Sequence, residues 1–171
     1  MSDTISKSAG PRIATCLWFN FNAEDAVHHY LSVFKSARIS GTARYGEHGP
    51  GSAGAVMTIA FEIEGQPFLA LNGGPQFPFT PAFSLIVNCD DQAEIDHYWD
   101  RLSEGGKTAR CGWLTDRFGV SWQIVPRAVA RWMTGAAQTA ARVMQAVLKM
   151  NRLEIAELEK AATAQGGGTH G

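Results

Sequence analysis

A carboxylate and a guanidinium stand side by side at Asp116 and Arg117, and this pair is a candidate for acid–base chemistry. A positioned carboxylate can take a proton from a substrate, and a neighbouring guanidinium can orient a polar group. The same segment lies between two short apolar stretches, so Asp116 can instead cap a turn in which Gly119 supplies a positive φ. We favour the structural interpretation and keep Asp116 as the catalytic candidate.

The histidines and cysteines form no motif typical of a metal centre. His28 and His29 are adjacent on a predicted helix and therefore point about 100° apart. None of the five histidines has a second histidine four residues along a predicted helix. The three cysteines are unclustered, and the chain starts without an apolar leader, so we expect a reducing, cytoplasmic setting.

Two glycines, Gly73 and Gly74, follow a strand-like run and raise the question of a nucleotide cofactor. A methyl donor such as S-adenosylmethionine usually binds at a glycine-rich turn between a parallel strand and a helix. Residues 75–79 contain two prolines and do not predict a helix. The glycines therefore do not predict a methyl-donor site.

These residues belong to a chain that resembles itself. Residues 20–30 match residues 88–98 at a separation of 68, with an identical Asn, His and Tyr in both copies. Residues 65–71 match residues 119–125 at a separation of 54, so the first copy carries about 14 extra residues. A repeat this long indicates two copies of one structural unit.

Each copy predicts one helix among short strands. The first copy predicts strands at residues 13–20, 38–45, 55–63 and 66–71, and a helix capped by Asn22. The second copy predicts strands at residues 83–89, 108–110, 112–115 and 121–125, and a helix capped by Asp90 or Asp91. Pro126 ends the last strand because it lacks an amide for the ladder. Both copies therefore have the order β-α-β-β-β.

Three segments carry a resemblance to a known family. They are Trp18-Phe19, residues 94–99 (EIDHYW) and, above all, residues 112–126 (GWLTDRFGVSWQIVP). With them the chain resembles the vicinal oxygen chelate superfamily of glyoxalases, bleomycin resistance proteins and dioxygenases over about residues 12–135. It is most similar to the PhnB-like branch, often labelled 3-demethylubiquinone-9 3-methyltransferase. The resemblance implies an α+β fold in which two βαβββ units form a curved mixed sheet around a central cavity, plus a C-terminal helical extension.

The resemblance also implies where a metal would bind. Metal-dependent relatives place His, Gln or Glu on the first and last strands of each unit, where they suit a divalent ion. Here those positions hold Thr15 and Leu69 in the first unit, and Gln123 with Ser84, or with Phe83 if the strand lacks a bulge, in the second. Such neutral groups hold zinc, nickel or iron poorly against water. We expect no metal and no cofactor.

A ligand-binding cavity remains the favoured interpretation. The strands are rich in aromatic rings, which suit a flat or apolar molecule, although alternation sends about half of them into the core. The candidate ligand-binding residues are Thr15, Trp18, Leu69, Ser84, Trp113, Trp122 and Gln123. We expect a metal-free protein that binds a small uncharged or aromatic organic ligand. The alternative is an enzyme of the same superfamily: a metal-dependent lyase, isomerase or dioxygenase, or the methyltransferase of the family label.

The charge and the segment pattern of the chain indicate its partners and its domain organisation. Fifteen basic and sixteen acidic residues give a net charge of −1, which favours neither nucleic acid nor an anionic membrane as a partner. We expect tails at residues 1–11 and 164–171, a paired domain at 12–135 with units at about 12–75 and 81–127, and a helical extension at 136–163. Its apolar stripe includes Val143, Met144, Val147 and Leu148, and predicts packing on the chain's own sheet or on a partner's. We therefore expect a homodimer.

Overall fold

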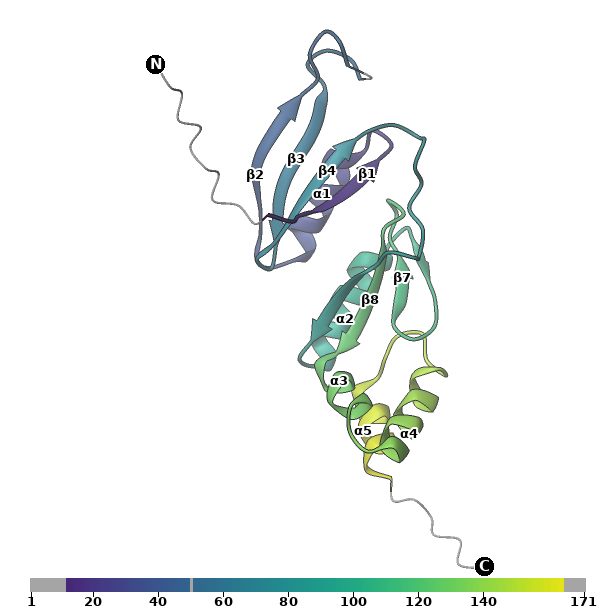
Figure 1. The fold of residues 1–171 in the computed structure, drawn as a ribbon. Coiled ribbons are helices and arrows are strands. Elements are labelled where there is room, and N and C mark those ends of the chain that lie inside the picture. Colours follow the sequence, from purple (N-terminus) through teal and green to yellow (C-terminus); the bar gives the residue numbers. More distant parts are fainter. Residues whose placement is uncertain (1–11, 50, 165–171) are drawn as a thin grey trace, which may run out of the picture. The chain divides into compact units, whose positions relative to one another are not determined.

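The computed structural model describes residues 12–49 and 51–164, so the expected tails at residues 1–11 and 164–171 lie outside it except for Ala164. The chain divides into two compact units, with the boundary between Pro78 and Phe79. Each unit contains one of the two copies found in the sequence (Figure 1). The expected α+β fold, with one βαβββ unit for each copy, is confirmed.

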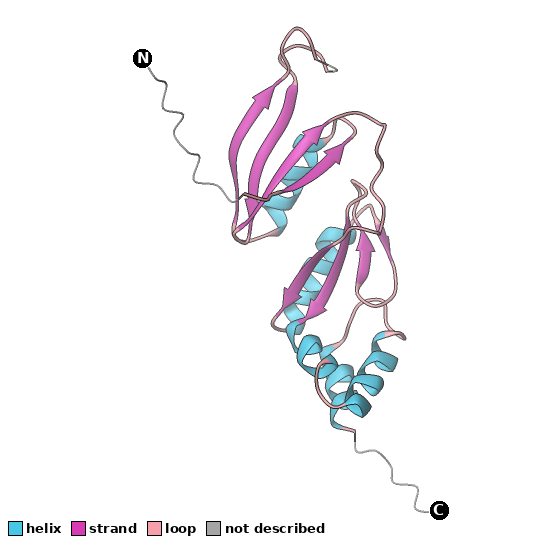
Figure 2. Ribbon diagram, viewed as in Figure 1, coloured by secondary structure: helices cyan, strands magenta, loops and turns pink. Residues whose placement is uncertain are grey.

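The first unit is a four-stranded mixed sheet with one helix on it (Figure 2). Its elements are β1 (Thr15–Phe19), α1 (Ala23–Val33), β2 (Ala37–Arg44), β3 (Val56–Ile63) and β4 (Gln66–Asn72). The strand order is β1-β4-β3-β2, and β1 runs parallel to β4 while the other pairs are antiparallel. The first and last strands of the unit are therefore direct neighbours in the sheet.

Helix α1 packs on one face of this sheet through aromatic rings. Tyr30 of α1 stacks on Phe61 of β3, with ring centroids 6.4 Å apart, and Phe61 stacks on Phe68 of β4 at 5.3 Å. Leu17 and Phe19 of β1 are buried on this same face, because they are in register with Ala70 and Asn72. Successive side chains alternate between faces, so the residues between them point to the open face.

The start of α1 is held by a residue from far along the chain. Asn22, which we expected to cap the helix, makes no side-chain cap bond. Instead Asn72, at the end of β4, accepts a hydrogen bond from Ala23 N at 2.9 Å through Oδ1 and donates to Glu24 Oε2 at 2.7 Å through Nδ2. The same amide donates to Val56 O at 3.0 Å, and Asn72 is 3% exposed. The cap expected at Asn22 is thus supplied by a strand.

The second unit repeats this plan. Its first elements are β5 (Leu85–Cys89), α2 (Gln92–Ser103), β6 (Lys107–Thr108), β7 (Trp113–Thr115) and β8 (Ser121–Pro126). The strand order is β5-β8-β7-β6, with β5 parallel to β8. Helix α2 has a local cap: Asp91 accepts from Glu94 N at 2.9 Å, and Glu94 accepts from Asp90 N at 2.8 Å. Asp91 is thus the N-cap among the two expected caps. Glu94 bonds the amide of Asp90, whereas in a capping box it would bond the amide of the cap itself.

Three helices follow β8 and belong to the second unit: α3 (Arg127–Met133), α4 (Ala137–Val147) and α5 (Ile155–Thr163). The extension starts earlier than expected, because Pro126 ends β8 and is also the residue before α3. The helices enclose a small core of their own, made by Val143, Val147, Leu153 and Leu158. Of the expected apolar stripe, Met144 and Leu148 stay exposed, at 40% and 51%. The homodimer expected from that stripe stays a prediction.

No helix within the described ranges is long and apolar enough to cross a bilayer.

We predict that Asn72→Ala lowers the free energy of unfolding by about 2 kcal/mol, because it leaves buried groups at the start of α1 without partners. Asn22→Ala is the matched control, since the Asn22 side chain makes no cap bond; we expect a change below about 0.5 kcal/mol. Urea unfolding followed by circular dichroism measures both. Equal losses in the two variants would mean that the cap is local after all.

Candidate functional site

The face of the first sheet opposite α1 carries the candidate residues Trp18 and Leu69. Cys16 is in register with Leu69, and Trp18 with Leu71, so all four side chains share this open face. Cys16 is exposed and the other three are partly buried. The open face of the first unit is therefore an aromatic and aliphatic surface with one thiol.

Trp18 is fixed by the turn after β4. Its indole Nε1 donates to Gly74 O at 2.8 Å, and the Phe77 ring meets it edge-on, with ring centroids 4.9 Å apart. A Cβ added at Gly73 would lie 2.3 Å from the Trp18 ring, so only glycine allows this close approach. The amides of Gly73 and Gly74 both donate to Phe19 O, at 3.0 and 3.3 Å. This glycine turn thus holds the indole of Trp18 in place, and its two amides are already used in bonds to Phe19 O.

The open face of the second sheet carries a polar pair among apolar side chains. Gln123 of β8 donates from Nε2 to Ser84 Oγ at 2.9 Å. Its neighbours in register are Ile86 of β5 and Trp113 of β7. Ile86 is 56% exposed, so this face presents apolar surface beside a neutral amide and hydroxyl. Three residues selected from the sequence, Ser84, Trp113 and Gln123, are therefore brought together.

Two residues of the expected ligand set lie elsewhere. Thr15 is in register with Phe68, which places it on the face that α1 covers. Trp122 is 2% exposed and alternates with Gln123, so it belongs to the core under α2. The expectation that these two side chains share a face with Leu69 and Gln123 is wrong, because neighbouring residues of a strand point to opposite faces.

Cys16, Leu71 and Ile86 lie on the open faces and are missing from the candidates of the sequence analysis. The separation of 68 pairs Cys16 with Ser84 and Trp18 with Ile86. The assignment of Ser84 as the partner of Thr15 assumed a bulge, and neither β1 nor β5 has a register shift against its neighbour. The constant separation of 68 between the two copies was therefore the signal in the sequence that identifies Cys16 and Ile86 as open-face positions.

Asp116 is a structural residue of the turn between β7 and β8. Its Oδ1 accepts from Phe118 N at 2.9 Å and from Val120 N at 3.0 Å, and its Oδ2 accepts from Trp122 Nε1 at 2.9 Å. The side chain is buried, with the residue 3% exposed, and Gly119 has the positive φ of 93°. These bonds support the turn-capping interpretation over a role as a base.

The thiols do not supply a ready nucleophile on these faces. Burial, and next the negative charge of Glu94, raises the pKa of Cys89 to about 12, so this thiol stays protonated at neutral pH. Burial also raises the pKa of Cys16. A thiol whose pKa is raised is a weaker source of thiolate, which is the reactive form.

The donor set does not fit a divalent metal. Ser84 and Gln123 are neutral, and Thr15 and Leu69 point to opposite faces of the first sheet. Among residues 12–49 and 51–164, no three His, Cys, Asp or Glu side chains are placed to hold an ion. Zinc, nickel and iron sites are built from such side chains, so the residues on the two open faces do not support a metal-dependent step.

The two βαβββ units have the fold expected of the PhnB-like branch, and the comparisons with known proteins bear out that resemblance. Residues 11–125 match the family described as 3-demethylubiquinone-9 3-methyltransferase, and the chain belongs to that family. The PhnB protein of Bacillus cereus is 36% identical, with a TM-score of 0.63 over 68% of this chain and 99% of that chain. A Pseudomonas aeruginosa protein is 22% identical, with a TM-score of 0.57 over 68% of this chain and 98% of its own. No curated protein matches the chain.

We predict that Asp116→Ala lowers the free energy of unfolding by at least about 2 kcal/mol, because two amides and an indole lose their acceptor. Arg117→Ala is the neighbouring control: its ion pair with Glu104 is 2.9 Å long but exposed, so we expect a loss of about 0.5 kcal/mol. Chemical unfolding monitored by tryptophan fluorescence measures both. A stable Asp116→Ala variant would reopen the case for Asp116 as a catalytic base.

Proposed function

We propose that this protein binds a small, uncharged aromatic molecule on the open face of its second unit. The observation that carries the proposal is the Gln123–Ser84 hydrogen bond on a face that also bears Trp113 and Ile86. Ligand sites combine apolar walls with a few polar groups that fix orientation. This face has both parts.

The polar pair suits a neutral ligand. Gln123 uses Nε2 for Ser84, and no donor to Gln123 Oε1 occurs among the described residues. The amide oxygen can therefore accept from a ligand hydroxyl, and the Ser84 hydroxyl can donate to a ligand oxygen. None of these groups carries a charge that would balance an ionised ligand, so ionised molecules incur the cost of desolvation without compensation.

The family description supports a ring with oxygen substituents. A methoxy-substituted quinone or its reduced phenol is flat and uncharged, and it offers both hydroxyl donors and oxygen acceptors. The Trp113 indole can stack on such a ring, and Gln123 can bond a ring hydroxyl. We take the compact, reduced ring as the probe, because an oxidised quinone would alkylate the exposed thiol of Cys16.

We predict saturable binding of a water-soluble methoxy-hydroquinone, measured by isothermal titration calorimetry under nitrogen. Gln123→Ala should weaken binding about five- to tenfold, as expected for the loss of one hydrogen bond. Gln145→Ala is the matched control, because Gln145 is an exposed glutamine of α4 and should leave the affinity unchanged.

A carboxylated analogue of the same ring provides a second comparison. It should bind at least tenfold more weakly, since Ser84, Trp113 and Gln123 offer no cation to the carboxylate. Lys107, a cation on this face, lies on the edge strand β6 in register with Thr115, two strands away from Gln123. Absence of binding to the wild-type protein, or an equal loss in the Gln123 and Gln145 variants, would reject the proposed site.

Methyl transfer is the second function, because the family is described by that reaction. The turn after β4 argues against a nucleotide-type methyl donor at this position, since the amides of Gly73 and Gly74 are bonded to Phe19 O and the indole of Trp18 fills the space against Gly73. We predict no calorimetric binding of S-adenosylmethionine, with or without the hydroquinone. Saturable binding together with methylation of a demethylated ring would establish the transferase instead.

A further inference from the structure

The C-terminal extension reaches the open face of the second sheet. Val125 of β8 is two residues beyond Gln123 and so lies on the same face, about 7 Å further along the strand. Val125 packs against the core of the extension, together with Trp132 and Met133. The open face beside Gln123 therefore ends where the extension begins.

Main-chain bonds hold the extension against the strands. Cys111 N donates to Met150 O and Gly112 N donates to Asn151 O, both at 2.8 Å. Gly112 has a φ of 79°, and a Cβ there would lie 2.5 Å from Ile124 O and 3.3 Å from the Leu153 side chain. Glycine at this position thus lets the segment before α5 lie directly on the sheet.

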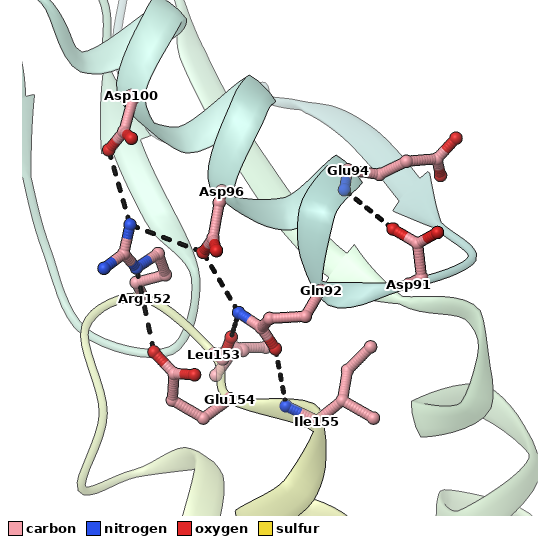
Figure 3. A network of polar contacts seen from close by, with 9 residues as sticks. All are labelled: Asp91, Gln92, Glu94, Asp96, Asp100, Arg152, Leu153, Glu154 and Ile155. Atoms are coloured by element: carbon pink, nitrogen blue, oxygen red, sulfur yellow. Dashed lines mark hydrogen bonds and ion pairs between the residues drawn. The ribbon is translucent and has the colours of Figure 1, made fainter.

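Gln92, in the first turn of α2, bonds the same segment (Figure 3). Its Nε2 donates to Leu153 O at 3.1 Å, and its Oε1 accepts from Ile155 N at 2.9 Å. The Gln92 amide therefore supplies both a donor and an acceptor to the main chain on the two sides of Glu154. A peptide group of a neighbouring strand would do the same. Leu153, 1% exposed, is the apolar anchor between these bonds.

The ion pairs around this fastening contribute less. Arg152 lies 3.4 Å from Asp96 and from Asp100, and 3.7 Å from Glu154, in partly exposed positions (Figure 3). Exposed pairs of this kind contribute about 0–1 kcal/mol because water and salt screen them. Gln92 and Leu153 are therefore the residues on which docking depends.

The extension also lies beyond the part of the chain that defines the family. The family match ends at residue 125, and helix α3 begins at Arg127. The Bacillus cereus relative is covered over 99% of its length by 68% of this chain. The end of the open face is therefore bounded by residues outside the family match.

We propose that the extension is the end wall of the ligand-binding face and restricts it to compact rings. A chain attached to the ring and running along β8 past Gln123 would meet Val125 and the helices packed on it. The proposal rests on the function proposed above. It assigns Gln92, which bonds the main chain of the segment before α5, as the residue that positions the extension.

Three cysteines allow the wall to be tested without a ligand. Cys16 is exposed, Cys89 is buried, and Cys111 is packed against the core of the extension. In Gln92→Ala we expect alkylation of Cys111, resolved by peptide mass spectrometry, to accelerate about tenfold. Cys89 should remain protected, which shows that the unit stays folded. Gln145→Ala, on the exposed side of α4, should leave all three rates unchanged.

Ligand selectivity gives the second readout. We expect the wild-type protein to bind the methoxy-hydroquinone at least tenfold more tightly than the same ring with a decyl chain. In Gln92→Ala the affinity for the decyl compound should rise at least fivefold, while the affinity for the compact ring changes less than threefold.

Each other outcome overturns the proposal. An unchanged Cys111 rate would show that Gln92 does not hold the extension. A faster Cys111 rate with unchanged selectivity would show that the extension is no wall. If the wild-type protein binds no hydroquinone, the proposed function has failed, and the Cys111 rates still report separately whether Gln92 holds the extension.

Discussion

The parallel pairing of the first and last strands in each unit determines what each sheet presents. β1 lies beside β4, and β5 beside β8, and the connecting helix covers one side of both strands. Once that side is filled by residues such as Leu17 and Trp122, alternation leaves the residues between them on the other side. Because neighbouring strand residues point to opposite faces, the burial of Trp122 under α2 places Gln123 on the open face.

The two units cap the start of their helices in different ways. In the first, Asn72 ends β4, caps α1 and bonds Glu24. In the second, Pro126 stands at the equivalent position, 54 residues later, and cannot make these bonds. Helix α2 is capped locally, and Gln92, the counterpart of Glu24 at a separation of 68, bonds the main chain of the extension instead. The unit without this asparagine is thus the one that carries the three additional helices.

Local patterns in the sequence were sufficient for the strands and both repeat helices, because periodicity and turn residues act over a few positions. Ser84 and Gln123 were selected through the resemblance to the family, and Trp113 because the strands are rich in aromatic rings. The Asn72 cap joins residues 49 positions apart and Gln92 bonds a residue 61 positions away, and no local pattern contains such contacts. The misplacement of Trp122 had another cause: its aromatic character was weighed above its alternation with Gln123.

Gln92 has a consequence for how the extension could change over time. Its bonds to the extension go to main-chain atoms of Leu153 and Ile155, and its third bond, from Nε2 to Asp96 Oδ1 at 3.1 Å, stays within α2. The attachment therefore does not depend on which side chains occupy positions 154 and 155. A glutamine in the first turn of the helix, a glycine at 112 and one buried leucine are enough to define the docking place. A helical segment of different sequence could therefore dock at the same place, and the sheet beneath it would stay the same.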